Sequence, residues 1–261
     1  MPFSTWIDLF GAAVGGGFTV KVLDIGYQEL RQRSERKRKA ERFVDEHLDP
    51  VLKAADEVVG KLRSLAERDF GALRRFDGRI PGEDLLAGDL ANLVYLFARF
   101  WARVEILRLQ SLYMALSKDK RGRRLLSFLD CLESQRVRMV DRAEQRAIGE
   151  VMIDRTSGSG SISYVAFVER YRTDEDFRKW MQPAVRLLTR MKHTSDRQRL
   201  LLYGAVLHAL IDSLDGEHEV SRNRPSYANK LTKRTRRDLR YRVFGAYLTF
   251  VERPGKYFEP R

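Results

Sequence analysis

Apolar residues recur at helical spacing through most of the chain after residue 50. A first stripe runs from Val51 to Leu65, with apolar positions three or four residues apart. The stretch from Asp89 to Ser117 is apolar around most of its circumference, which is typical of a helix at the centre of a bundle. The chain also has only seven Pro and few β-branched runs, which favours helices over strands. The sequence therefore predicts an all-α protein, a bundle of about five to seven helices.

Within the central helix we expect Phe97 and Trp101 to be buried. The same stretch carries Arg99 and Arg103 on its remaining polar stripe. Because a half-buried arginine needs a carboxylate partner, we expect Arg99 or Arg103 to meet acids of residues 130–144, in a following helix from about Arg123 to Ile153.

Helix boundaries are indicated by capping residues and by proline. Asp49 followed by Pro50 is typical of an N-cap and a first helical position. Ser161 or Ser163 is expected to cap a helix that Pro183 interrupts, and Ser195-Asp196 to cap an apolar core helix at residues 200–211. The run Thr156-Ser-Gly-Ser-Gly-Ser161 reads as a flexible break. We expect this break to separate an N-terminal helical half, residues 28–155, from a C-terminal helical half, residues 156–261.

The first 27 residues have a different character. Leu9 to Val20 carries no charge and is rich in Gly and Ala, and seven Lys or Arg follow between residues 31 and 42. Extended from Trp6 to Ile25, the segment reaches the roughly 20 residues that a membrane helix needs. The basic flank indicates that the C-terminal side lies in the cytoplasm. The residues that define this membrane-associating segment are Trp6, Phe10, Gly11, Gly15 and Phe18.

The glycines of this segment favour self-association in a membrane, but they also fit a different interpretation. Gly11 and Gly15 are four apart, and such spacing lets two membrane helices approach closely, which favours a homo-oligomer. The alternative is an arm packed into a groove of the protein itself, with residues 15–17 as a bend. Three consecutive glycines weaken a helix by about 1 kcal/mol each in water, which favours that alternative.

Charge indicates the kind of partner. The chain has 49 Lys and Arg against 36 Asp and Glu, a net charge of +13, and this excess favours anionic partners. The densest basic cluster lies near the C-terminus, against one acid, Asp238, and with Tyr227 and Tyr241 interleaved. Its members are predicted to bind anionic lipid or nucleic acid: Arg222, Arg224, Lys230, Lys233, Arg234, Arg236, Arg237, Arg240 and Arg242.

Candidate chemistry is limited to one helix end. His208, Asp212 and Asp215 are spaced by four and three, so that they share a helical face, and His218 follows in the next loop. Two imidazoles and two carboxylates are ligands that suit a divalent metal. The simpler interpretation is a hydrogen-bonded core histidine beside ordinary acids. No nucleotide-binding or catalytic motif is present, and we expect no cofactor and no small-molecule substrate.

These patterns lead to one principal functional hypothesis and two alternatives. The first is a non-enzymatic, membrane-anchored cytoplasmic protein that acts by association, in a regulatory, scaffolding or membrane-effector role. The second is a soluble nucleic-acid-binding protein that uses residues 222–242. The third is a helical metal-dependent hydrolase or nuclease that uses His208, Asp212 and Asp215.

Overall fold

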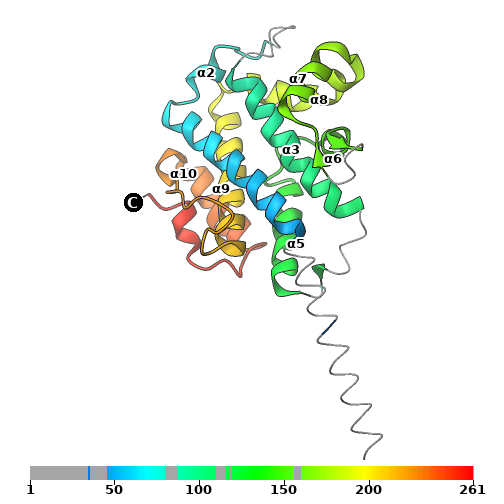
Figure 1. Cartoon of the computed structure of the whole chain (residues 1–261). Helices are drawn as coiled ribbons and strands as arrows, with labels where there is room; N and C mark the ends of the chain where they lie inside the picture. Colours follow the sequence, from blue (N-terminus) through cyan, green and yellow to red (C-terminus); the bar gives the residue numbers. More distant parts are fainter. Residues whose placement is uncertain are drawn as a thin grey trace, which may run out of the picture. The chain divides into compact units, whose positions relative to one another are not determined.

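Helices make up almost all of the secondary structure in the described part of the chain (Figure 1). The computed structural model describes residue 35 and residues 46–79, 88–109, 116–117, 119–155 and 160–260. In these residues the all-α prediction is confirmed, and residues 45–261 belong to one compact unit. Residues 6–25, the predicted membrane-associating segment, lie outside the described residues.

The described residues form nine helices, which exceeds the expected five to seven because short helices add to the long ones. The first occupies residues 46–67. The others are α2 (Gly71–Arg74), α3 (Asp89–Leu109), α5 (Lys120–Glu133), α6 (Arg142–Val151), α7 (Tyr164–Thr173), α8 (Glu175–Thr189), α9 (Thr194–Leu214) and α10 (Lys233–Asp238). Shorter turns of helix are η2 (Ala228–Lys230), η3 (Leu239–Phe244) and η4 (Pro254–Tyr257). Strands β1 (Ile153–Asp154) and β2 (Gly160–Ser161) pair antiparallel, with Ile153 opposite Ser161.

The core lies around α3, as the apolar pattern predicts. Phe97 and Trp101 are 0% and 1% exposed, so their predicted burial is confirmed. The indole N–H of Trp101 donates a hydrogen bond of 3.0 Å to the hydroxyl of Tyr203 on α9, and the ring of Phe97 contacts both. Gly149 lets α6 lie directly against α3, because a Cβ atom there would be 2.8 Å from the carbonyl oxygen of Trp101. Aromatic packing and one close approach therefore hold α3 between α6 and α9.

Arg99 of α3 has a different partner from the one expected. Arg99 pairs at 2.6 Å with Glu57, in the helix of residues 46–67, and not with an acid of residues 130–144. It is Arg108, five residues beyond Arg103, that reaches Glu133 on α5. Glu133 is 6% exposed and also accepts hydrogen bonds from Arg142 and Arg146 of α6. This buried carboxylate joins α3, α5 and α6.

Several predicted boundaries were wrong for identifiable reasons. The single helix from Arg123 to Ile153 is two helices, because Asp141 forms a capping box with Glu144 that starts α6. Pro183 lies inside α8 and does not interrupt it, while Asp174 caps that helix and Ser163 caps α7 as expected. The helix of residues 46–67 runs through Pro50, so Asp49 is not its N-cap. The helix predicted from Ser195-Asp196 starts at Thr194.

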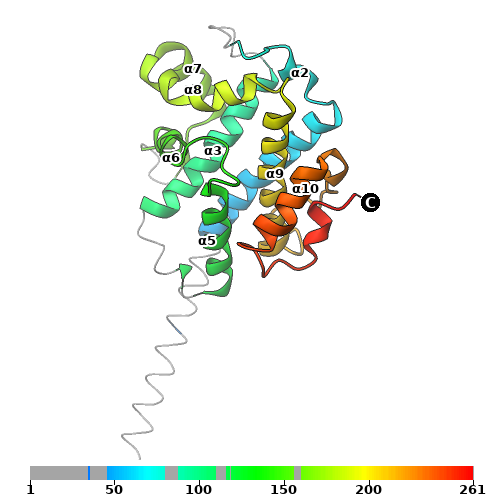
Figure 2. The same ribbon diagram turned by 180° about the vertical axis from the view of Figure 1, so that it is seen from behind.

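The C-terminal part of the chain packs beside α9. After α9 the chain returns along that helix through η2 and then forms α10, η3 and η4 (Figures 1 and 2). Both views show α10 and the last segment on the same side of α9. Leu239, Val243, Phe244 and Tyr257 are buried at this junction. The predicted basic cluster is thus carried by a segment that the core anchors.

Candidate anion-binding surface

The central part of the basic cluster is a short, well-capped helix. The hydroxyl of Thr232 accepts a hydrogen bond from the N–H of Thr235 and caps α10. Thr235 and Leu239 are buried, whereas Lys233, Arg234 and Arg237 are exposed and Arg236 is half-buried. Buried Thr235 and Leu239 therefore attach this segment to the core, while most of its basic side chains lie at the surface.

The nine basic residues of the cluster differ in their partners. Arg240 pairs with Glu259 at 2.6 Å, and Arg242 pairs with Asp238 at 3.2 Å. Arg224 pairs with Asp56. The remaining six have no acid partner among the residues that the structure describes: Arg222, Lys230, Lys233, Arg234, Arg236 and Arg237. Of these, Arg236 is half-buried and the other five are exposed.

Arg224 belongs to the fold and not to the exposed surface. Its guanidinium donates hydrogen bonds of 2.7 and 3.0 Å to the two carboxylate oxygens of Asp56, and this bidentate pair raises the pKa of Arg224. The guanidinium also lies over Gly60, where a Cβ atom would be 2.8 Å from it. A side chain already held in this way has little capacity to bind an outside anion.

A hollow of about 400 Å³ lies beside the unpaired cations. Lys233, Arg236, Arg237 and Arg240 line it together with Tyr241 and Phe258. Tyr241 is 64% exposed and lies among these cations. Cations and an exposed ring therefore meet at one place on the surface.

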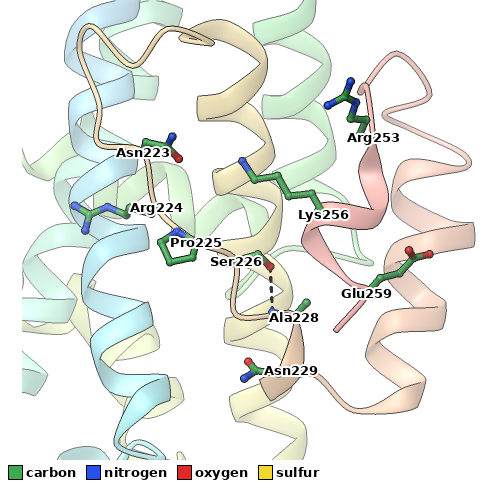
Figure 3. Close-up of a pocket in the computed structure, with 9 residues that line it drawn as sticks. All are labelled: Asn223, Arg224, Pro225, Ser226, Ala228, Asn229, Arg253, Lys256 and Glu259. Atoms are coloured by element: carbon green, nitrogen blue, oxygen red, sulfur yellow. Dashed lines mark hydrogen bonds between the residues drawn. The ribbon is translucent and has the colours of Figure 1, made fainter. Parts of the chain in front are cut away.

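A larger hollow, of about 630 Å³, separates the 223–229 segment from the C-terminal residues (Figure 3). Asn223, Ser226 and Asn229 line one side, and Arg253, Lys256 and Glu259 line the other. Figure 3 shows Arg224 turned away toward the helix of residues 46–67, consistent with its pair to Asp56.

His208, Asp212 and Asp215, the candidate metal ligands at the end of α9, do not form one site. Asp215 is bound by the loop that follows it, since it accepts hydrogen bonds from the N–H groups of Glu219, Val220 and Ser221 and from the Ser221 hydroxyl. Burial opposes ionisation, but these hydrogen bonds outweigh it and lower the pKa of Asp215. Asp215 is therefore a cap for the loop, and only His208 and Asp212 remain together.

Asp212 is the centre of a second cluster that includes residues from the C-terminal segment. Its Oδ2 accepts hydrogen bonds from Lys256 Nζ at 2.5 Å and from the Tyr257 hydroxyl at 2.8 Å. The Nε2 atoms of His208 and His218 each lie 3.7 Å from its Oδ1. Within the described residues, no group of three or more His, Cys, Asp or Glu side chains is placed to hold a metal ion.

Sequence reasoning missed Lys256, Tyr257 and Arg253 in this neighbourhood. Lys256 and Tyr257 are 44 and 45 residues from Asp212, and neither belongs to a motif that predicts a contact. The one local signal is the pair of histidines, ten residues apart, on either side of the acids.

The membrane prediction rests on the sequence alone. Trp6, Phe10, Gly11, Gly15 and Phe18 lie outside the described residues. Among the helices that the structure does describe, none combines the length and apolar character required to cross a bilayer.

Comparisons with known proteins found no matching family model, no matching curated protein and no matching solved structure.

Proposed function

We propose that this chain is a helical association protein that binds anionic membrane surfaces through α10 and its neighbours. The observation that supports the proposal is that Lys233, Arg234, Arg236 and Arg237, four of five consecutive residues, have no acid partner in the part of the chain that the structure describes. A cationic patch near a membrane gains about 1 kcal/mol for each Lys or Arg that meets anionic lipid. The apolar segment at residues 6–25, followed by its own basic run, would supply a second anchor.

Replacing two exposed arginines tests the surface. Arg234→Gln combined with Arg237→Gln should weaken binding to phosphatidylserine vesicles by about 30-fold, the equivalent of about 2 kcal/mol. Arg236 is kept, because its half-buried side chain contributes to the fold. Arg172→Gln combined with Arg186→Gln removes the same charge from exposed positions on α7 and α8, and serves as control. Equal loss in both variants would show that net charge, and not this surface, drives binding.

Removing residues 1–27 tests the anchor. The shortened protein should pass from the membrane fraction to the soluble fraction, while its circular dichroism keeps the helical signal. The anchoring proposal is wrong if the full-length protein is soluble without detergent from the start.

A second candidate, nucleic-acid binding, is favoured by the exposed ring of Tyr241 among the cations. Bases stack on such rings, at about 1–3 kcal/mol per base. Tyr241→Leu separates the two candidates, because leucine keeps an apolar side chain for a membrane but offers no stacking face. Loss of single-stranded DNA binding with vesicle binding retained would favour nucleic acid. DNA affinity should then also fall steeply with salt.

A further inference from the structure

The basic surface on α10 includes a hollow in which part of its charge is gathered. Four cations line this hollow of about 400 Å³, at intervals of one to three residues along the chain: Lys233, Arg236, Arg237 and Arg240. Residues three or four apart share one face of a helix, so that these side chains lie on the same side of α10. Arg234 is exposed on the same helix but does not line the hollow. The hollow thus separates the members of the basic cluster into two groups.

The lining of this hollow carries a net charge of +3, because one carboxylate, that of Glu259, stands against the four cations. Glu259 pairs with Arg240 at 2.6 Å, and both side chains are exposed. Lys233, Arg236 and Arg237 have no acid partner among the residues that the structure describes. The hollow therefore offers several positive charges to a single ligand.

Aromatic side chains fix the position of Arg240 in this lining. Its guanidinium lies 5.3 Å from the centre of the Phe258 ring, and Phe258 is itself buried. Hydrogen bonds with Tyr241 and Glu259 raise the pKa of Arg240. An arginine that is already oriented loses less conformational freedom when an anion binds beside it.

We propose that this hollow binds a head group that carries two neighbouring phosphate monoesters. Each monoester has a charge of about −1.5 to −2 at neutral pH, so that two of them match the net charge of +3 in the lining. A phosphatidylserine head group has a single net negative charge and would leave most of the lining unmatched. Guanidinium groups suit phosphate, because they donate pairs of parallel hydrogen bonds to its oxygens. The lipid form of this ligand rests on the proposed function, whereas a free molecule with the same two phosphates requires no membrane.

Vesicles test the lipid form. The full chain is mixed with vesicles that contain phosphatidylinositol bisphosphate, or with vesicles whose phosphatidylserine gives the same total charge, and bound protein is measured by cosedimentation. The wild type should bind the bisphosphate vesicles at least about tenfold more tightly. Arg237→Gln removes a cation from the hollow and should abolish most of this preference. Arg234→Gln removes the same charge outside the hollow, so it should weaken binding to both vesicles and leave their ratio unchanged.

Calorimetry with soluble inositol trisphosphate tests the same hollow without a membrane. Arg237→Gln should weaken this binding by about tenfold, and Arg172→Gln, a distant charge control, should leave it unchanged. Glu259→Gln removes the carboxylate from the lining and should strengthen binding by about fivefold, the effect of one exposed charge. Because damage to the fold would weaken binding, this increase tests the site even if an arginine variant is destabilised.

The outcomes distinguish the hollow from the broader membrane surface. A vesicle preference, or binding of inositol trisphosphate, that Arg237→Gln reduces more than Arg234→Gln supports the bisphosphate site. Equal binding of the two vesicle types without binding of inositol trisphosphate would overturn the site and leave the proposed membrane function standing. Binding of inositol trisphosphate without binding to either vesicle would keep the site for a free ligand and overturn the membrane function. Binding of no vesicle and no inositol trisphosphate would overturn both.

Discussion

Arg224 and Asp56 form a bidentate ion pair, at 2.7 and 3.0 Å, between parts of the chain that are 168 residues apart. The pair joins the segment after α9 to the helix of residues 46–67. Arg224 is therefore held in an ion pair within the fold, whereas Arg234 and Arg237 of the same basic cluster are exposed. Fold stability and surface charge are thus supplied by different members of one sequence cluster.

The contribution of this pair can be measured against its neighbour. Asp56→Ala should lower the free energy of unfolding by about 3 kcal/mol, because it leaves the half-buried Arg224 without its carboxylate. Glu57→Ala removes the partner of Arg99, a pair with more solvent exposure, and should change stability by about 0–1 kcal/mol. Urea denaturation of both variants gives the two values. Similar losses would mean that the Arg224–Asp56 pair has no special role.

Trp101 provides the corresponding test of the core. Trp101→Ala should destabilise the protein by about 3–5 kcal/mol, since it removes a buried ring and leaves the Tyr203 hydroxyl without its donor. Trp180→Ala is the matched control, because Trp180 is 49% exposed on α8 and should change stability by no more than about 0.5 kcal/mol. Intrinsic fluorescence during urea titration follows both. A small effect at Trp101 would contradict the central position of α3.

Local patterns predicted the helices better than the contacts between them. The apolar circumference of residues 89–117 correctly indicated the burial of Phe97 and Trp101. It could not indicate that Arg99 pairs with Glu57, because which helix lies beside α3 is decided by packing of the whole chain. The break before α6 had a local signal in Asp141 and Glu144, which the longer apolar stripe obscured.

For the candidate sites as well, the sequence indicated local features but not the contacts between distant parts of the chain. Net charge and spacing indicated the basic cluster, but only three-dimensional structure separates the paired Arg224 from the unpaired Arg234. His208 and Asp212 were predictable as neighbours at helical spacing. Lys256 was not, since its contact with Asp212 depends on the path of the chain through α10 and η4.

Close helix packing at Gly149 leads to a further prediction. In Gly149→Ala the new Cβ would be 2.8 Å from the Trp101 carbonyl oxygen and 2.9 Å from Glu105, so α3 and α6 must separate. We expect a loss of about 1–3 kcal/mol, as for other overpacked cores. Gly71→Ala is the control, because nothing lies within 4 Å of its added Cβ, and should be neutral or stabilising by about 0.5 kcal/mol. Thermal denaturation compares the two.

Glu133 should make stability depend on pH in the acid range. Burial opposes its ionisation, but hydrogen bonds and charge from Arg146 and Arg108 outweigh burial and hold its pKa below the ordinary value of 4.5. A carboxyl whose pKa is lower in the folded state stabilises the fold above its unfolded pKa, and this stabilisation is lost as pH falls through the folded pKa.

The variant Glu133→Gln isolates this effect. Near neutral pH it should be less stable than wild type by about 3 kcal/mol, because three arginines lose a buried carboxylate. Between about pH 5 and pH 3 the gap should narrow, since the wild type alone loses the Glu133 contribution. Urea titrations across this range measure it. Glu150→Gln, at an exposed position on α6, is expected to keep a constant small difference. A gap for Glu133→Gln that stays constant with pH would show that its carboxylate is not stabilised in the folded state.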